Sequence, residues 1–240
     1  MQVGKLLDRV ESNAIVLPEF QREFVWKRQQ AKELMDSLYK GYPIGGLLTW
    51  ETENPPEIKN DAIDEEKQAL FEILLDGQQR LTTISLILAV MREKYLNQGM
   101  DEQADSISEK YLWQEDIDTA RYPNLSLSKF DDSDYMAMLE QRFDDVSDSN
   151  LKEGFQFYAN KMDSLEPDEI NDIRNKLLRG VTAVSITTDG EQSAFRLFET
   201  LNDRGLELSA VDLMKNHVFS TAATDPTIDY DRIRDDWEAI

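Results

Sequence analysis

Hydrophobic residues recur with helical and strand-like spacing over the first 96 positions of the chain. In residues 27–40 apolar side chains lie three and four positions apart, the spacing of one helical face, and Gly41 follows as a C-terminal cap. The run at 69–75 is apolar on both faces, as expected for the central strand of a sheet. The pattern predicts helices at 3–11, 27–40 and 82–96 and strands at 14–18, 44–51 and 69–75.

The pattern becomes more polar after residue 96 and returns to a strand near residue 181. Residues 97–180 are rich in Asp, Glu, Asn and Ser, with helices predicted at 101–112, 132–142, 150–164 and 168–179 and a strand at 124–128. A clear strand is predicted at 181–188, and helical segments follow it. We therefore predict an α+β fold with three parts. These are the N-terminal part of the core at 1–96, a mainly helical subdomain at 97–180, and the C-terminal part of the core at 181–240.

Composition restricts the chemistry that this chain can carry. The formal net charge is −22, so contact with nucleic acid requires a local basic patch. There are no cysteines, which excludes disulfides and thiolate metal sites and favours a cytoplasmic setting. The single histidine, His217, cannot build a multi-histidine metal site, although a magnesium site made of oxygen ligands remains open. No apolar run is long enough to span a membrane, and no signal peptide opens the chain.

One polar stretch interrupts two apolar runs and is the first candidate site. Asp76, Gly77, Gln78, Gln79 and Arg80 stand between a predicted strand and a predicted helix. Free N–H groups at a helix N-terminus bind anions, and Gly77 permits a sharp turn and close backbone approach. Arg80 can hold a phosphate, Asp76 can hold Mg²⁺ or accept a proton from water, and Gln78 or Gln79 can orient that water. A purely structural interpretation, in which Asp76 caps the helix and Arg80 pairs with a surface carboxylate, is equally open at this point.

Two further stretches carry polar side chains in suggestive surroundings. Gln21 and Arg22 lie among aromatic residues and precede a basic cluster that includes Lys27, which suits contact with a base or phosphate. Aromatic core packing explains the same pattern. Asn202 and Arg204 lie on a loop between two predicted helices, where turn chemistry alone favours Asn and Gly. Lys215, three residues after Asp212, shares a helix face with it.

Four motifs, in this order, resemble the N-terminal domain of GmrSD-type restriction endonucleases. The same domain opens anti-phage proteins of the SspE and BrxU types. The motifs are PEFQREFVW, PIGGLLTW, LLDGQQRLTTI and FETLNDRGLELSAVDLMKN. The resemblance covers almost the whole chain and is weakest over residues 97–180. It implies a core related to the ParB and sulfiredoxin nucleotide-binding fold, a small mixed sheet with flanking helices.

The resemblance also implies roles for particular residues. Asp76 to Arg80 would form a nucleoside triphosphate site that binds GTP, ATP or another nucleotide with Mg²⁺. Gln21 and Arg22 would lie beside this site. Asn202, Arg204 and Lys215 would close it from the C-terminal side. Phe20 stands where members that sense modified DNA tend to have tyrosine.

The function expected from these observations is that of a nucleotide-dependent regulatory and sensor domain in a restriction or anti-phage endonuclease. Its partners would be nucleotide, DNA that can carry modifications, and a C-terminal nuclease domain or subunit of the His-Asn-His type, with self-association also open. The final helical segment ends without a stop signal, as expected for the N-terminal piece of a longer protein. Two alternatives remain: a non-catalytic ParB-like DNA-binding module, and a scaffold for a separate nuclease subunit.

Overall fold

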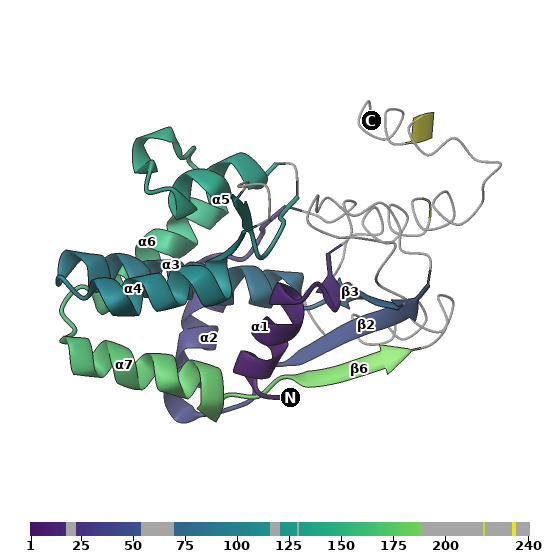
Figure 1. Cartoon of the computed structure of the whole chain (residues 1–240), viewed down its shortest axis with the longest axis horizontal. Helices are drawn as coiled ribbons and strands as arrows, with labels where there is room; N and C mark the ends of the chain where they lie inside the picture. The colour runs from purple at the N-terminus through teal and green to yellow at the C-terminus, as the bar shows by residue number, and fades with distance from the viewer. Residues whose placement is uncertain are drawn as a thin grey trace.

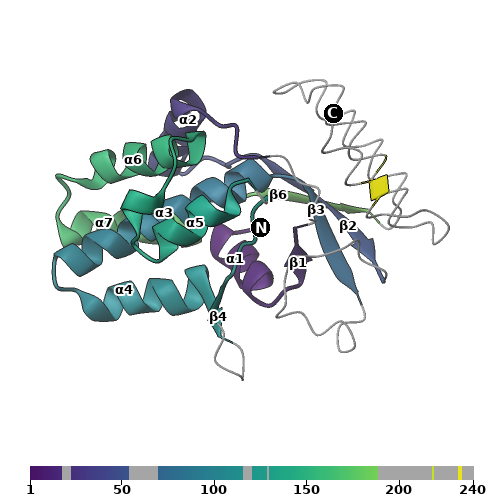
Figure 2. The ribbon, with the colours of Figure 1, turned by 90° about the horizontal axis from the view of Figure 1, so that it is seen from above.

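The structure, a computed structural model, describes residues 1–17, 23–53, 70–115, 121–128 and 130–188, with single positions at 218 and 232–233. A four-stranded sheet lies beside a layer of helices (Figure 1). This arrangement confirms the α+β class. Helix α3 runs through the middle of the helical layer, between α4 and α6 (Figure 2).

The sheet is mixed and its strand order is β1-β3-β2-β6. Strand β3 is antiparallel to β2, whereas β1 pairs with β3 and β6 with β2 in parallel. The predicted central position of β3 is confirmed. A separate antiparallel ribbon joins β4 and β5. The strand bounds are Ile15–Val16 for β1, Gly46–Thr52 for β2, Phe71–Asp76 for β3, Trp113–Glu115 for β4, Arg121–Pro123 for β5 and Val184–Thr188 for β6.

The helices follow the predicted pattern closely. Their bounds are Val3–Glu11 for α1, Arg28–Lys40 for α2, Gln78–Asn97 for α3, Asp101–Ile107 for α4, Asp132–Leu139 for α5, Asn150–Met162 for α6 and Pro167–Asn175 for α7. Short π-helical turns at Ser108–Leu112 and Lys176–Gly180 extend α4 and α7, and a 3-10 turn covers Phe143–Asp145. None of the helices in the described ranges is both long and apolar enough to cross a membrane.

Both ends of α2 are fixed by local chemistry. The Gln30 side-chain carbonyl accepts the backbone N–H of Lys27 at 3.1 Å, which satisfies a donor at the helix start. Gly41 adopts the left-handed conformation at φ +67°, and its N–H donates to the carbonyl of Leu38. The predicted cap at Gly41 is therefore confirmed.

The core has two parts, one on each side of the sheet. Leu47 and Leu74 face the helical layer and join a large cluster that includes α1, α2, most of α3, and α4 to α7. Residues 97–180 contribute to this same cluster. Trp50 and Ile73 belong to a second cluster with β1 and β6 residues. The strands are thus apolar on both faces, which is why their sequences show continuous apolar runs.

Two predicted elements are wrong in detail. Residues 124–128 do not form a strand, because the pairing of β5 with β4 ends at Pro123. Leu125 and Leu127 enter the large cluster without strand pairing. The helix predicted at 132–142 ends at Leu139. Gln141 takes a left-handed φ of +63°, and the N–H of Arg142 turns back to the carbonyl of Ala137 at 2.7 Å.

Candidate functional site

The predicted strand–turn–helix junction is present at residues 76–78. Asp76 ends β3, Gly77 has a φ of +108°, and α3 begins at Gln78, four residues earlier than the pattern predicted. A Cβ on Gly77 would lie 2.7 Å from Cδ2 of Leu47, so a side chain cannot be accommodated without movement. Gly77 is therefore required both by its φ angle and by its packing against β2.

The N-terminus of α3 has the features of an anion site. This helix is 20 residues long, its N-cap residue Gly77 has no side chain that could cap it, and its first turn contains no acidic residue. The N–H groups of the first turn have no acceptor within the helix, and the helix dipole places partial positive charge there. Of the structural interpretation, the cap by Asp76 has no hydrogen bond to support it among the described residues, whereas Arg80 does form an ion pair with a partly exposed carboxylate, that of Asp76.

Arg80 is held at the same corner by the start of β2. Its Nη1 donates to the carbonyl of Gly46 at 2.7 Å and lies 3.4 Å from Oδ2 of Asp76. About a quarter of the Arg80 side chain is exposed, as is about a third of that of Asp76. A partner carbonyl fixes the position of the guanidinium without neutralising its charge. The contact with Asp76 is long, so most of the charge of Arg80 remains available to a ligand.

The glycine pair at the start of β2 makes room for Arg80. A Cβ on Gly45 would lie 2.8 Å from Nε of Arg80, and Gly45 also has a positive φ of +106°. This stretch was predicted as a strand and belongs to the motif PIGGLLTW, but Gly45 was not predicted as part of the site. A Gly-Gly pair directly before an apolar strand was the available signal, because it indicates close approach of another group.

The effect of Gly45→Ala can be compared with that of Gly41→Ala. Gly41 also has a positive φ, but a Cβ added there would meet nothing within 4 Å. We expect Gly41→Ala to lower the free energy of unfolding by roughly 1–2 kcal/mol. Gly45→Ala should cost somewhat more, roughly 2–3 kcal/mol, because its φ of +106° lies farther from the left-handed minimum and because the guanidinium of Arg80 must move. Urea denaturation of both variants provides the measurement, and equal losses would show that Arg80 does not need this space.

Gln79 has a different orientation from its neighbours in the motif. Its side chain is buried, and Oε1 accepts the backbone N–H groups of Val25 and Trp26 at 2.8 and 3.2 Å. Its Nε2 donates to the carbonyl of Glu23 at 3.1 Å. One amide thus satisfies three backbone groups of residues 23–26. Gln79 therefore joins the junction to the segment that follows Arg22 in sequence.

Two other elements hold the same segment. Oδ2 of Asp131, just before α5, accepts the N–H of Phe24 at 2.7 Å and the hydroxyl of Ser128 at 2.9 Å. Nδ2 of Asn150, at the start of α6, donates to the carbonyl of Phe24 at 3.4 Å. Neither residue carries a sequence signal for this role, because each lies more than 100 positions from its partner.

Burial raises the pKa of the Asp131 carboxyl, and the two hydrogen bonds oppose this shift without cancelling it. The folded protein therefore binds this proton more tightly than the unfolded chain, and this contribution to stability falls as the pH rises above the unfolded pKa. In Asp131→Asn, one amide oxygen can accept both bonds without a buried charge. We expect the stability of Asp131→Asn relative to the wild type to be more favourable at pH 7 than at pH 4, measured by urea denaturation. An unchanged difference would contradict this account.

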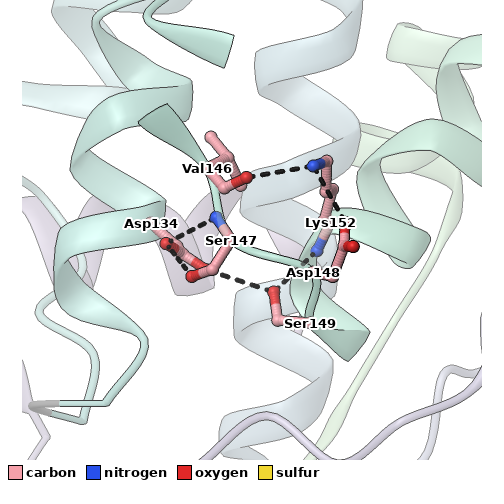
Figure 3. A network of polar contacts seen from close by, with 6 residues as sticks. All are labelled: Asp134, Val146, Ser147, Asp148, Ser149 and Lys152. Carbon is pink, nitrogen blue, oxygen red and sulfur yellow. Dashed lines mark hydrogen bonds and ion pairs between the residues drawn. The ribbon is translucent and has the colours of Figure 1, made fainter. Parts of the chain in front are cut away.

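The start of α6, which carries Asn150, is itself fixed by a polar network (Figure 3). The buried Asp134 carboxylate accepts the N–H and hydroxyl of Ser147 and the hydroxyl of Ser149. Ser149 in turn caps α6 by accepting the N–H of Lys152 at 3.3 Å. The network orients α6 and so supports the contact between Asn150 and residues 23–26.

The structure brings part of the predicted site together. Asp76, Gly77, Gln78 and Arg80 form one corner, where Nε2 of the half-buried Gln78 lies 3.5 Å from the carbonyl of Leu74. Gln79 points away from that corner, toward residues 23–26. The remaining predicted residues lie outside the described ranges; they are Gln21, Arg22, Asn202, Arg204 and Lys215.

Comparison of the sequence with known protein families identifies the class of domain to which the chain belongs. The family described as the GmrSD restriction endonuclease, N-terminal domain, matches residues 3–219. The chain therefore belongs to the GmrSD N-terminal domain family, as the four motifs indicated. It is also 30% identical, over 238 residues, to an uncharacterized protein of Methanocaldococcus jannaschii. That alignment covers 87% of this chain and 40% of the relative, so the chain spans well under half of the relative's length.

Proposed function

We propose that this chain is the nucleotide-binding regulatory domain of a restriction or anti-phage endonuclease. It would bind a nucleoside triphosphate with Mg²⁺ at Asp76 to Arg80, hydrolyse it slowly, and pass the nucleotide state to a nuclease domain or subunit. The observation that carries the proposal is the position of Arg80. Its guanidinium is fixed on the Gly46 carbonyl beside the uncapped N-terminus of α3. A fixed cation and free backbone N–H groups at one corner favour a phosphate chain.

The residues of the corner have separable roles in this proposal. The first-turn N–H groups of α3 and Arg80 hold phosphate oxygens, and Gly77 allows the backbone to approach them. Gln78 orients the attacking water, because the amide of Gln79 is already used by three backbone groups. Gln79 then acts as a positioning residue. Gln21, Arg22, Asn202, Arg204 and Lys215 complete the pocket.

The donor set at Asp76 fits Mg²⁺ that is shared with a nucleotide. Among the described residues, no three acidic or histidine side chains gather into a metal cluster. Magnesium in nucleotide sites is commonly held by one or two carboxylates together with phosphate oxygens and water. Asp76 supplies one such carboxylate, about one-third exposed. The metal ion would neutralise phosphate charge at this corner.

The proposal is tested by incubating the purified chain with GTP, ATP, CTP and UTP in the presence of Mg²⁺. Equilibrium binding and phosphate release are measured for each nucleotide, with folding checked by circular dichroism. We expect binding of at least one nucleotide and release that requires Mg²⁺. Absence of binding and of release with all four nucleotides in a folded sample would overturn the proposal.

A second candidate function, DNA binding, is supported by one surface feature. A pocket of about 550 Å³ between α2 and α6 is lined by Arg28, Phe157 and Lys161, with Glu153, Gln156 and Asn160. The guanidinium of Arg28 and the ammonium of Lys161 lie 5.9 and 6.0 Å from the centre of the Phe157 ring. Two cations beside one pocket suit contact with the phosphates of a nucleic-acid backbone.

The double variant Arg28→Ala/Lys161→Ala tests this candidate function. If the surface binds DNA, affinity should fall roughly tenfold and the salt dependence of binding should become shallower by about two charges. Fluorescence anisotropy at several salt concentrations measures both quantities. Nucleotide binding at Arg80 should be unchanged in the variant. DNA binding that keeps its affinity and salt slope would exclude this surface.

A further inference from the structure

A second polar pocket lies at the far end of α3 from the nucleotide corner. Its volume is about 420 Å³, within the range of small-molecule sites. Arg92 lies twelve residues after Arg80 on α3, which corresponds to about 18 Å along the helix axis. The lining comes from α3, α4, β4, β5 and the end of α5, and comprises Arg92, Leu96, Ala104, Asp105, Ser108, Trp113, Arg121, Leu139, Glu140 and Gln141.

Arg92 is the unusual member of this lining. Its side chain is only 4% exposed, and Nη2 donates to Oε1 of Glu93 at 2.8 Å. Its Nε is buried and has no hydrogen-bond partner among the described residues. A buried guanidinium with an unused donor is costly unless an acceptor reaches it. The Arg92 side chain nevertheless lines the pocket, so its positive charge lies next to any ligand there.

Arg121 brings a second guanidinium to the pocket from a different element. Its Cζ lies 4.7 Å from the centre of the Trp113 ring, and Trp113 itself is buried. Stacking on an indole orients the planar guanidinium and leaves its N–H groups free to bind a carboxylate or phosphate. Two arginines from α3 and β5 therefore line one cavity.

The acidic side chains of the pocket do not neutralise these arginines directly. Glu140 is paired with Arg142, whose Nη2 lies 2.6 Å from Oε2 of Glu140. No ion pair links Asp105 to Arg92 or Arg121 among the contacts of the described residues. Asp105 and Gln141 provide acceptors and an amide on the lining, which suit hydrogen-bond donors of a ligand.

We infer that this pocket is a second ligand site, distinct from the nucleotide corner, which binds a phosphorylated small molecule of up to nucleotide size. Its phosphate lies against the guanidinium groups of Arg92 and Arg121, and its polar groups face Asp105 and Gln141. The inference is independent of the proposed NTP site, because it shares no residue with Asp76 to Arg80. Ligand binding there would tie α3 to α4 and to the β4–β5 ribbon.

The test measures the thermal midpoint and calorimetric affinity of the full chain without Mg²⁺. The probes are inorganic phosphate, ribose 5-phosphate and the eight common nucleoside and deoxynucleoside monophosphates, with unphosphorylated ribose as a comparison. We expect at least one phosphorylated probe to raise the midpoint and ribose to have no effect. Arg121→Ala should fold normally and lose roughly tenfold to hundredfold in affinity. Arg92→Met/Glu93→Gln removes both charges of the buried ion pair, so that Glu93 is not left as an unpaired carboxylate, and should lose the ligand-induced shift.

Two controls locate any binding that is observed. Arg174→Ala removes a guanidinium that lies 5.8 Å from the centre of the Tyr95 ring, a contact of the same kind outside the pocket lining, and should leave affinity unchanged. Arg80→Ala should also leave the affinity for the phosphorylated probe unchanged, which distinguishes this pocket from the nucleotide corner. The inference is overturned if no phosphorylated probe shifts the midpoint. It is equally overturned if Arg121→Ala and Arg92→Met/Glu93→Gln respond to the probe as the wild type does.

Discussion

Gln79→Ala should lower the free energy of unfolding by roughly 2–4 kcal/mol, the largest stability loss expected from a single side chain near the site. The variant leaves the N–H groups of Val25 and Trp26 and the carbonyl of Glu23 without their partner. Unsatisfied backbone groups in a mostly buried setting are costly. The measurement is urea denaturation with extrapolation to water. Nucleotide affinity should fall as well, because residues 23–26 directly follow Gln21 and Arg22.

Gln78→Ala is the matched control for this prediction. The two glutamines are adjacent, but Gln78 has only a long contact of 3.5 Å to the carbonyl of Leu74. Its removal should change stability by less than about 0.5 kcal/mol. If Gln78 orients water, phosphate release should slow while nucleotide affinity is kept. Equal stability losses in the two variants would show that the hydrogen bonds of Gln79 to residues 23–26 are not important for stability.

Arg80→Ala should produce the largest functional loss, a decrease in nucleotide affinity of roughly 10- to 100-fold. Arg80 supplies the positively charged side chain of the first turn of α3. A charge-assisted hydrogen bond to phosphate is stronger than a neutral one. Isothermal titration calorimetry with Mg²⁺ and the preferred nucleotide measures this loss. Arg80→Lys should recover only part of it, since an ammonium group cannot bind bidentately.

Arg179→Ala serves as the charge-matched control, because Arg179 is exposed in the π-helical turn after α7. It removes the same charge from the protein and should leave nucleotide affinity unchanged. The thermal midpoint of each variant checks folding, since Arg80 also donates to Gly46. Equal affinities for Arg80→Ala, Arg179→Ala and the wild type would remove Arg80 from the nucleotide site.

Local patterns were sufficient to predict most elements of the fold. The apolar spacing and Gly41 identified α2, and the continuous apolar run identified β3 as a central strand, because these signals depend on neighbouring residues only. The wrong prediction of a strand at 124–128 arose because strand pairing depends on distant residues. Alternation of Leu125 and Leu127 is typical of a strand, but both side chains are taken up by the core without strand pairing. Whether such a segment pairs depends on the rest of the fold.

The sequence indicated the residues of the candidate corner but not their orientations. The motif identified Asp76 to Arg80, and the junction geometry follows from Gly77. The different directions of Gln78 and Gln79 could not be read from two adjacent identical residues. They depend on Asp131, Asn150 and the segment at 23–26, which approach only after long-range packing. The same holds for Gly45, whose importance depends on contact with Arg80.

The central claim is that the corner formed by Asp76 to Arg80 binds nucleotide phosphates. A crystal structure with Mg²⁺ and a non-hydrolysable analogue of the preferred nucleotide tests it most directly. Our account predicts phosphate density against the first-turn N–H groups of α3, within hydrogen-bonding distance of the Arg80 guanidinium, and Mg²⁺ beside Asp76. Density for the bound analogue elsewhere on the protein, with none beside Gly77, would contradict it.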